Sequence, residues 1–219
     1  MQHIPIFAFD FSMNKPAMAC LIEYNLYFNV WPLNIDKISE NKLNNVQVKV
    51  YNRQLSPIKD KKMNENTLIC EHVTRAKSLS NLILNDILEI LNIYNINADV
   101  CYVSNEGFSF GSKGDAILDL SGYKYILMST LIDNGFKNLR TYSPITLKKT
   151  AGCSKKGMKK LDMINAISNE DVNLHPFIKT LHDNPDSLKK KTAFVQCVDD
   201  ITDAYWCLQT TIEKEKIEL

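Results

Sequence analysis

The sequence has almost no net charge, no long apolar run and no paired cysteines, and each of these absences excludes a class of protein. The net charge is +1, so a nucleic-acid surface can arise only where basic residues cluster. No apolar run approaches the roughly 18 residues of a membrane span. The first residues, MQHIPIFAFDF, lack the basic and apolar regions of a secretion signal. We therefore expect a protein that is neither secreted nor membrane-bound.

The six cysteines lack the spacings of a zinc site or a redox motif. None forms a C-x-x-C pair, and none stands at zinc spacing from a histidine. Cys20, Cys101 and Cys207 lie in apolar stretches, so we expect them to be small core residues. A reduced, intracellular protein is the favoured interpretation.

The length of 219 residues and the hydrophobic share of 45% suit one domain covering 1–219. The segment 34–66 differs from the rest because it is polar and rich in lysine and asparagine. We expect it to be an insertion or a long loop. Within it, only residues 46–50 alternate in the way a further strand would.

The remaining chain alternates between short apolar runs and helical patterns. Apolar residues at helical spacing predict a long amphipathic helix over 67–94. Other helices are expected at 115–133, from 144, at 158–167 and at 192–216, and strands at 4–11, 17–24, 26–32, 98–104 and 139–142. The segment 171–191 is expected to be irregular. This order predicts an α/β protein with a mixed five-stranded sheet and helices on both faces.

Acidic residues occur at three places where the chain is otherwise apolar. Asp10 ends the run IFAFD, where an unpaired charge is costly. Glu106 follows an apolar strand, and sites of open α/β sheets gather at strand ends. Asp199, Asp200 and Asp203 interrupt an apolar helix at spacings that share one face. Each has a simpler interpretation, as a solvated strand-end acid or as an acid at a helix start.

Together these acids are what a two-metal site needs. Mg²⁺ prefers carboxylate oxygens, and two such ions stabilise the attacking and leaving oxygens of a phosphoryl displacement. We therefore predict a metal-dependent nuclease that holds two Mg²⁺ ions, or Mn²⁺ in their place. The predicted ligands are Asp10, Glu106, Asp200 and Asp203, with Asp199 as the alternative to Asp200.

Basic and aromatic residues near these acids are candidates for DNA contacts. A lysine run is by itself compatible with a solvated loop, but beside an acidic metal site lysines would neutralise phosphates. The run comprises Lys148, Lys149, Lys155, Lys156, Lys159 and Lys160. In the glycine-containing loop after Glu106, Lys113 is a further DNA-binding candidate. Phe108 and Phe110 are candidates for stacking on opened bases, although a core position for one of them is equally compatible.

The sequence resembles the RuvC-type Holliday junction resolvases of the ribonuclease H-like nuclease superfamily. The resemblance covers 4–33 and 98–211, and residues 34–66 have no counterpart in it. It is carried, in order, by FAFDFSMNKPAMACLIEY, VSNEGFSFGSKGDAILDLSGYKYILMSTLIDNG, TYSPITLKKTAGCSKKGMKKLDMINAI and DDITDAYWCL. Family members carry the late acids either three apart or as a double Asp, and both patterns are available here.

The resemblance implies a ribonuclease H-like fold and a crossover junction endonuclease that resolves four-way or branched DNA. It implies catalytic roles for Asp10, Glu106, Asp200 and Asp203, and a catalytic lysine at Lys159 or Lys160. It also implies a homodimer that joins two copies of the helix 115–133.

Two other functions fit the same acids. One is another ribonuclease H-like nuclease, acting on flaps, packaged DNA or RNA–DNA hybrids. The other is a DNA-junction-binding protein that does not cleave. A sugar-kinase-like phosphotransferase is disfavoured, because FSMNKP after Asp10 contains none of the glycines that a phosphate loop needs.

Overall fold

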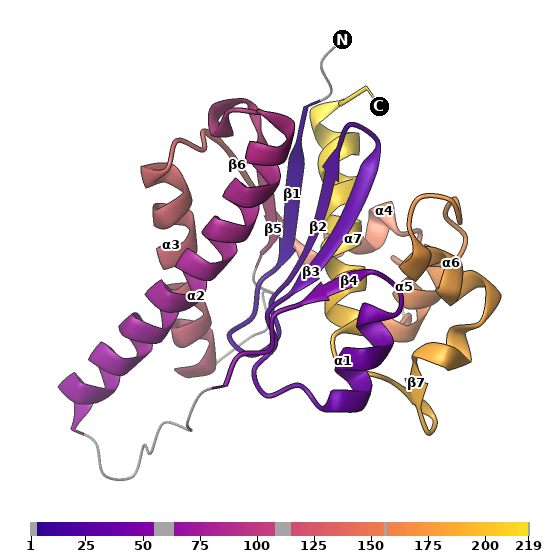
Figure 1. Cartoon of the computed structure of the whole chain (residues 1–219), viewed down its shortest axis with the longest axis horizontal. Coiled ribbons are helices and arrows are strands. Elements are labelled where there is room, and N and C mark those ends of the chain that lie inside the picture. The colour runs from indigo at the N-terminus through magenta and orange to yellow at the C-terminus, as the bar shows by residue number, and fades with distance from the viewer. Residues whose placement is uncertain (1–3, 55–63, 108–114, 156, 219) are drawn as a thin grey trace.

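The computed structural model describes residues 4–54, 64–107, 115–155 and 157–218, and for residues 65 and 115–119 it describes the backbone alone (Figure 1). A mixed sheet runs through the centre, with helices on both of its faces. The predicted α/β class and mixed sheet are therefore confirmed.

The sheet has six strands within the described residues, in the order β4-β3-β2-β1-β5-β6. Their bounds are β1 Ile6–Asp10, β2 Ala17–Ile22, β3 Asn25–Val30, β4 Val48–Val50, β5 Tyr102–Glu106 and β6 Asn138–Tyr142. The first three strands are antiparallel, whereas β4, β5 and β6 each run parallel to a neighbour.

The prediction of five strands was wrong by one, because the segment 34–66 adds a strand to the sheet. Val48 of β4 lies opposite Phe28 of β3, and the segment also contains α1, Lys37–Asn44. Asp36 caps that helix by accepting hydrogen bonds from the backbone of Ile38 and Ser39. This segment therefore contains a strand and a helix as well as loop.

Two helices cover one face of the sheet and five the other, among the described residues. On the first face lie α2, Glu65–Tyr94, and α3, Asp115–Asp133. The second face carries α1, α4 Pro144–Thr150, α5 Lys160–Ile167, α6 Pro176–Asp183 and α7 Val198–Glu215. The short 3-10 helices Ala98–Val100 and Pro185–Leu188 and the hairpin β7 Lys189–Lys190 with β8 Ala193–Phe194 complete the elements.

The prediction that 171–191 is irregular was wrong, because this segment contains α6. Pro176 occupies the first turn, which suits its fixed backbone angle. His175 caps the helix, since its Nδ1 accepts from the backbone N–H of Phe177 at 3.1 Å. The following helix starts at Val198 and not at 192, after Cys197 adopts a left-handed φ of 72°.

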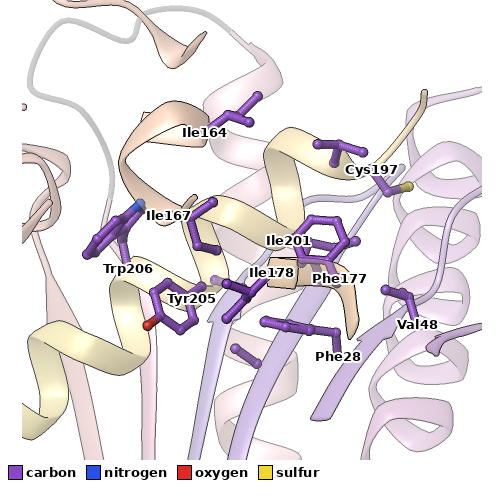
Figure 2. Packing of buried hydrophobic residues seen from close by; sticks show 14 of the residues in the cluster. Phe28, Val48, Ile164, Ile167, Phe177, Ile178, Cys197, Ile201, Tyr205 and Trp206 are labelled. Carbon is purple, nitrogen blue, oxygen red and sulfur yellow. The ribbon is translucent and has the colours of Figure 1, made fainter. Parts of the chain in front are cut away.

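The alternation of side chains along β1 divides the core into two layers. Phe7 and Phe9 point to α2 and α3, whereas Ile6 and Ala8 point to α7. In the second layer Phe28 packs between elements distant in sequence, with ring centroids 5.3 Å from Phe177 and 6.3 Å from Tyr205 (Figure 2). All six cysteines are free and five are buried, so Cys20, Cys101 and Cys207 are core residues as predicted.

In the part of the chain that the structure describes, none of the helices combines the length and the apolarity needed to cross a membrane.

Candidate metal centre

The strand alternation that divides the core also directs two acids to the same side of the sheet. Asp10 continues the series Ile6 and Ala8, so its side chain faces α7. On the neighbouring parallel strand, Ser104 and Glu106 share that face. Both acids lie at the carboxyl ends of their strands, β1 and β5, and these ends are at the same edge of the sheet.

The third acid, Asp203, lies near the other two because α7 packs across this face of the sheet in a fixed register. Thr211 donates to the hydroxyl of Ser104 at 2.7 Å, and the Cys207 thiol donates to the same oxygen at 3.5 Å. Asp203 lies one further turn before Cys207, on the same face of the helix. This turn brings its carboxylate beside the end of β5 and next to Glu106.

Asp10, Glu106 and Asp203 therefore form one cluster. One carboxylate oxygen from each lies within 4.8 Å of the others. Asp203 is buried, and Asp10 and Glu106 are half-buried. Three anionic groups so close together in a largely dry environment repel one another unless a cation or protons lie between them.

The pKa values of the acids reflect this crowding. Burial, together with the charges of Asp203 and Glu106, raises the pKa of Asp10 well above its usual value. Burial and the charge of Asp203 raise the pKa of Glu106 to about 7. Burial also raises the pKa of Asp203, although Lys160 opposes the rise. The ionised form of each acid is thus disfavoured until a positive partner is present.

The two neighbouring acids of α7 have different surroundings. Asp200 is buried, and its Oδ2 has no hydrogen-bond partner among the described residues. Burial and the charge of Asp199 raise the pKa of Asp200 to about 7. Asp199 is more exposed and pairs with Lys160 at 3.3 Å. Burial favours a higher pKa for Asp199, but the charge of Lys160 lowers it.

Of the predicted lysines, Lys160 forms ion pairs with the acids. Lys160 begins α5, and its ammonium lies 3.4 Å from Asp203 and 3.3 Å from Asp199. Although burial would lower the pKa of Lys160, the charges of Asp203, Asp199 and Asp10 raise it. Lys159 precedes it as the exposed N-cap residue of α5.

The other basic and aromatic candidates lie on α4, in the loop that follows it, or outside the described residues. Lys148 is half-buried in α4, and its charge acts on Asp203. Lys149 of α4 and Lys155 of the following loop are exposed. Phe108, Phe110, Lys113 and Lys156 lie outside the described residues.

Two lysines beside the acids were not predicted. Lys124 of α3 is buried and donates a hydrogen bond to the main-chain carbonyl of Glu106. Lys15 follows β1, and its charge opposes the rise in the pKa of Asp200. In the sequence, only the position of Lys15 in the turn after Asp10 could have indicated a role for it. Lys124 lies within a helical pattern that gave no indication of a role.

The donor set suits a hard divalent cation. Mg²⁺ and similar ions are held by a few carboxylates together with water and substrate oxygens. Asp10, Glu106 and Asp203 converge on one point, and the unpartnered Oδ2 of Asp200 is a further buried oxygen nearby. These residues define an α/β protein with an acidic centre able to hold a metal ion.

Comparison with known proteins gives structural likeness but no sequence match. No family model matches the chain, and no curated protein does. Three similar solved structures each have a TM-score of 0.48. Thermus thermophilus RuvC is 10% identical, and the match covers 98% of this chain and 98% of that one. The structure of T. thermophilus RuvC in complex with a Holliday junction substrate is 9% identical, and the match covers 98% of this chain and 96% of that one. The yeast mitochondrial Holliday junction resolvase is 9% identical, covering 95% of this chain and 78% of that one.

Two of these structures are of RuvC and the third is a Holliday junction resolvase, and the sequence resembles the RuvC-type resolvases. Identities of 9–10% and a TM-score of 0.48 are too low for an activity to be transferred. The acidic cluster itself therefore carries the functional proposal.

Proposed function

We propose that this protein is a metal-dependent endonuclease that cuts branched DNA, with four-way junctions as its preferred substrate. The observation that supports this most is the convergence of Asp10, Glu106 and Asp203 within 4.8 Å, with Asp200 buried next to them. These four acids would hold two Mg²⁺ ions, or Mn²⁺ in their place. Asp199 is the weaker ligand because Lys160 already pairs with it.

Each group at this edge has a part in the proposed chemistry. When bound, divalent cations supply the positive charge that stabilises attacking and leaving oxygens during displacement at phosphorus. The four carboxylates hold and orient the cations. The ammonium of Lys160, 3.4 Å from Asp203, would stabilise negative charge that develops on the phosphate. Lys159, which is exposed, is better placed to contact DNA.

The DNA would lie across the edge that carries the acids. Lys148 of α4 lies close enough for its charge to act on Asp203, and Lys149 of α4 and Lys155 of the loop after it are exposed. These three lysines would neutralise phosphates. Lys156 and Lys113, with Phe108 and Phe110, remain proposed DNA contacts. The overall net charge of +1 makes this local grouping necessary for binding.

Four DNA substrates and two metal conditions test the proposal. We expect a synthetic four-way junction to be cut in Mg²⁺ and left intact in EDTA, with 5′-phosphate and 3′-hydroxyl products. Linear duplex, flap and RNA–DNA hybrid of the same sequence should be cut much more slowly. Equal cutting of flap or hybrid would replace junction resolution with another nuclease activity. Tight junction binding without metal-dependent cutting would identify a non-cleaving binding protein.

We further propose that the active species is a homodimer formed through α3. Tyr125 and Ile132 are 68% and 58% exposed and stand seven residues apart, on one face of this helix. Burying such side chains in a symmetric interface would remove apolar area from water.

The dimer is tested by light scattering after size exclusion. The wild-type protein should have the mass of two 25.1 kDa chains, and Tyr125→Glu should have the mass of one. Ile38→Glu, at an exposed apolar position of α1, is the matched control and should remain dimeric. A monomeric wild-type protein at micromolar concentration would refute the interface.

A further inference from the structure

The end of β5 is held differently on its two sides. Its pairing with β1 ends at Phe9 and Asn105, one residue before Glu106. On the other side Glu106 still faces Tyr142 of β6, and the N–H of Gly107 donates to the Tyr142 carbonyl at 2.6 Å. Glu106 is therefore the last residue of its strand, one step beyond the support of β1.

The main-chain carbonyl of Glu106 accepts its hydrogen bond from a side chain of α3. The donor is the ammonium of Lys124, a residue only 6% exposed. Lys124 lies on the inner face of α3, three and seven residues before the buried Leu127 and Leu131. The Lys124 side chain therefore points into the core, on a face of α3 whose other buried side chains include Leu127 and Leu131.

A buried ammonium costs several kcal/mol unless its surroundings compensate for the lost water. At the acidic edge, the charges of Glu106 and Asp10 supply part of this compensation for Lys124. Burial lowers the pKa of Lys124, and these charges oppose the decrease. An apolar residue would fill the same space without this cost, so the charge itself has a use at this position.

Little room for adjustment remains at the strand end. A Cβ added to Gly107 would lie 3.1 Å from the Tyr142 carbonyl oxygen and 3.3 Å from a methyl carbon of Thr141. The backbone on either side of the Glu106 carbonyl is thus fixed by β6 at Gly107 and by Lys124 from α3. The direction of the Glu106 carboxylate follows from the position of this backbone.

We propose that Lys124 is a positioning residue of the acidic centre, whose ammonium fixes the end of β5 and so directs the Glu106 carboxylate toward Asp10 and Asp203. Its effect passes through Glu106 and requires no contact with DNA. The activity test of this inference rests on the proposed nuclease function, whereas the backbone test does not.

Hydrogen exchange in the metal-free protein tests the backbone effect. In Lys124→Met, amides over 104–107 should exchange about tenfold faster or more, because the Glu106 carbonyl loses its donor. Lys124→Arg keeps a donor and should restore most of the protection. Lys49→Met is the matched control, because Lys49 lies on β4, away from the acids, and pairs with the buried Asp86 of α2. It should leave exchange over 104–107 unchanged.

Kinetics in Mg²⁺ test the consequence for the site. Lys124→Met should lower kcat about tenfold or more with KM for the junction within about twofold, because misplacing one ligand affects the reacting geometry more than DNA binding. Lys124→Arg should recover most of kcat. Unchanged exchange and unchanged kcat per folded molecule, with only a lower melting temperature, would overturn the inference. If the wild-type protein cuts no DNA, the proposed function fails, and the exchange comparison still decides the role of Lys124.

Discussion

Asp10→Asn is expected to reduce metal-dependent cleavage of a four-way junction by about 10³-fold or more, while junction binding is retained. Asp10 is the strand residue that joins Glu106 and Asp203 into one cluster, so asparagine removes a central charge from the proposed metal ligands. Loss of metal-derived stabilisation worth about 4 kcal/mol corresponds to that factor. Binding should survive because the lysines of α4 and α5 are unchanged. Gel cleavage in Mg²⁺ and gel-shift binding in Ca²⁺ measure the two properties.

The same substitution should stabilise the protein in the absence of metal. Asparagine has the shape of aspartate but no charge, so it relieves repulsion with Glu106 and Asp203 in a buried setting. We expect the melting temperature in EDTA to rise, by roughly 3 °C for each kcal/mol relieved. Asp99→Asn is the matched control, because this surface acid pairs only weakly with Lys137 at 3.3 Å.

Mg²⁺ should change the melting temperatures of the wild-type protein and Asp10→Asn by different amounts. It should raise the melting temperature of the wild-type protein, since a ligand that binds only the folded state stabilises it. The increase should be small or absent in Asp10→Asn. Full cleavage by Asp10→Asn, or an equal Mg²⁺ effect on both proteins, would contradict the assignment of Asp10 to the metal centre.

Asp86→Ala is expected to destabilise the protein by about 3 kcal/mol, which lowers the melting temperature by roughly 6–12 °C. The Asp86 side chain is 2% exposed and joins three elements. It accepts hydrogen bonds from Asn29 of β3, from Lys49 of β4 at 2.9 Å, and from Tyr51 just after β4. Alanine would leave a cavity and would strip the buried Asn29 amide of its acceptor.

Two further variants distinguish the effect of the buried Asp86 hydrogen bonds on stability from that of a surface charge. Burial raises the pKa of Asp86 even though Lys49 and Asn29 favour its charged form. Asp86→Asn, which keeps an acceptor without the charge, should therefore cost less than Asp86→Ala. Glu89→Ala is the matched control, because Glu89 is 64% exposed and pairs with the same Lys49. Chemical denaturation measures all three, and equal losses for Asp86→Ala and Glu89→Ala would refute the network.

The two acids of the cluster that lie on strands could be predicted because their signal is local. An acid that ends an apolar strand is visible in the sequence, and Asp10 and Glu106 do lie at the ends of β1 and β5. The choice among Asp199, Asp200 and Asp203 depends instead on how α7 rotates and slides against β5. That register is set by contacts such as Thr211 with Ser104, which lie far apart in sequence. The sequence favoured Asp200 and Asp203 and kept Asp199 as the alternative to Asp200, because it does not contain the register of α7 on the sheet.

Elements without strong periodicity were harder to predict. β4 has three residues and belongs to the sheet only because β3 offers it a partner. The segment that contains α6 was dominated by its prolines and lysines, although Phe177, Ile178 and Leu181 do follow helical spacing. Lys124 and Asp86 lie among apolar positions of their helices, where a charge has no visible partner until the tertiary structure supplies one.

The docking of α7 on β1 and β5 also sets when the centre can exist during synthesis. Asp10 and Glu106 leave the ribosome well before Asp203, which belongs to the last helix of the described chain. A nascent chain that ends at α6 has two of the clustered acids and lacks the third, so it cannot complete the group. The proposed cutting activity would thus begin only when α7 has been made and has packed.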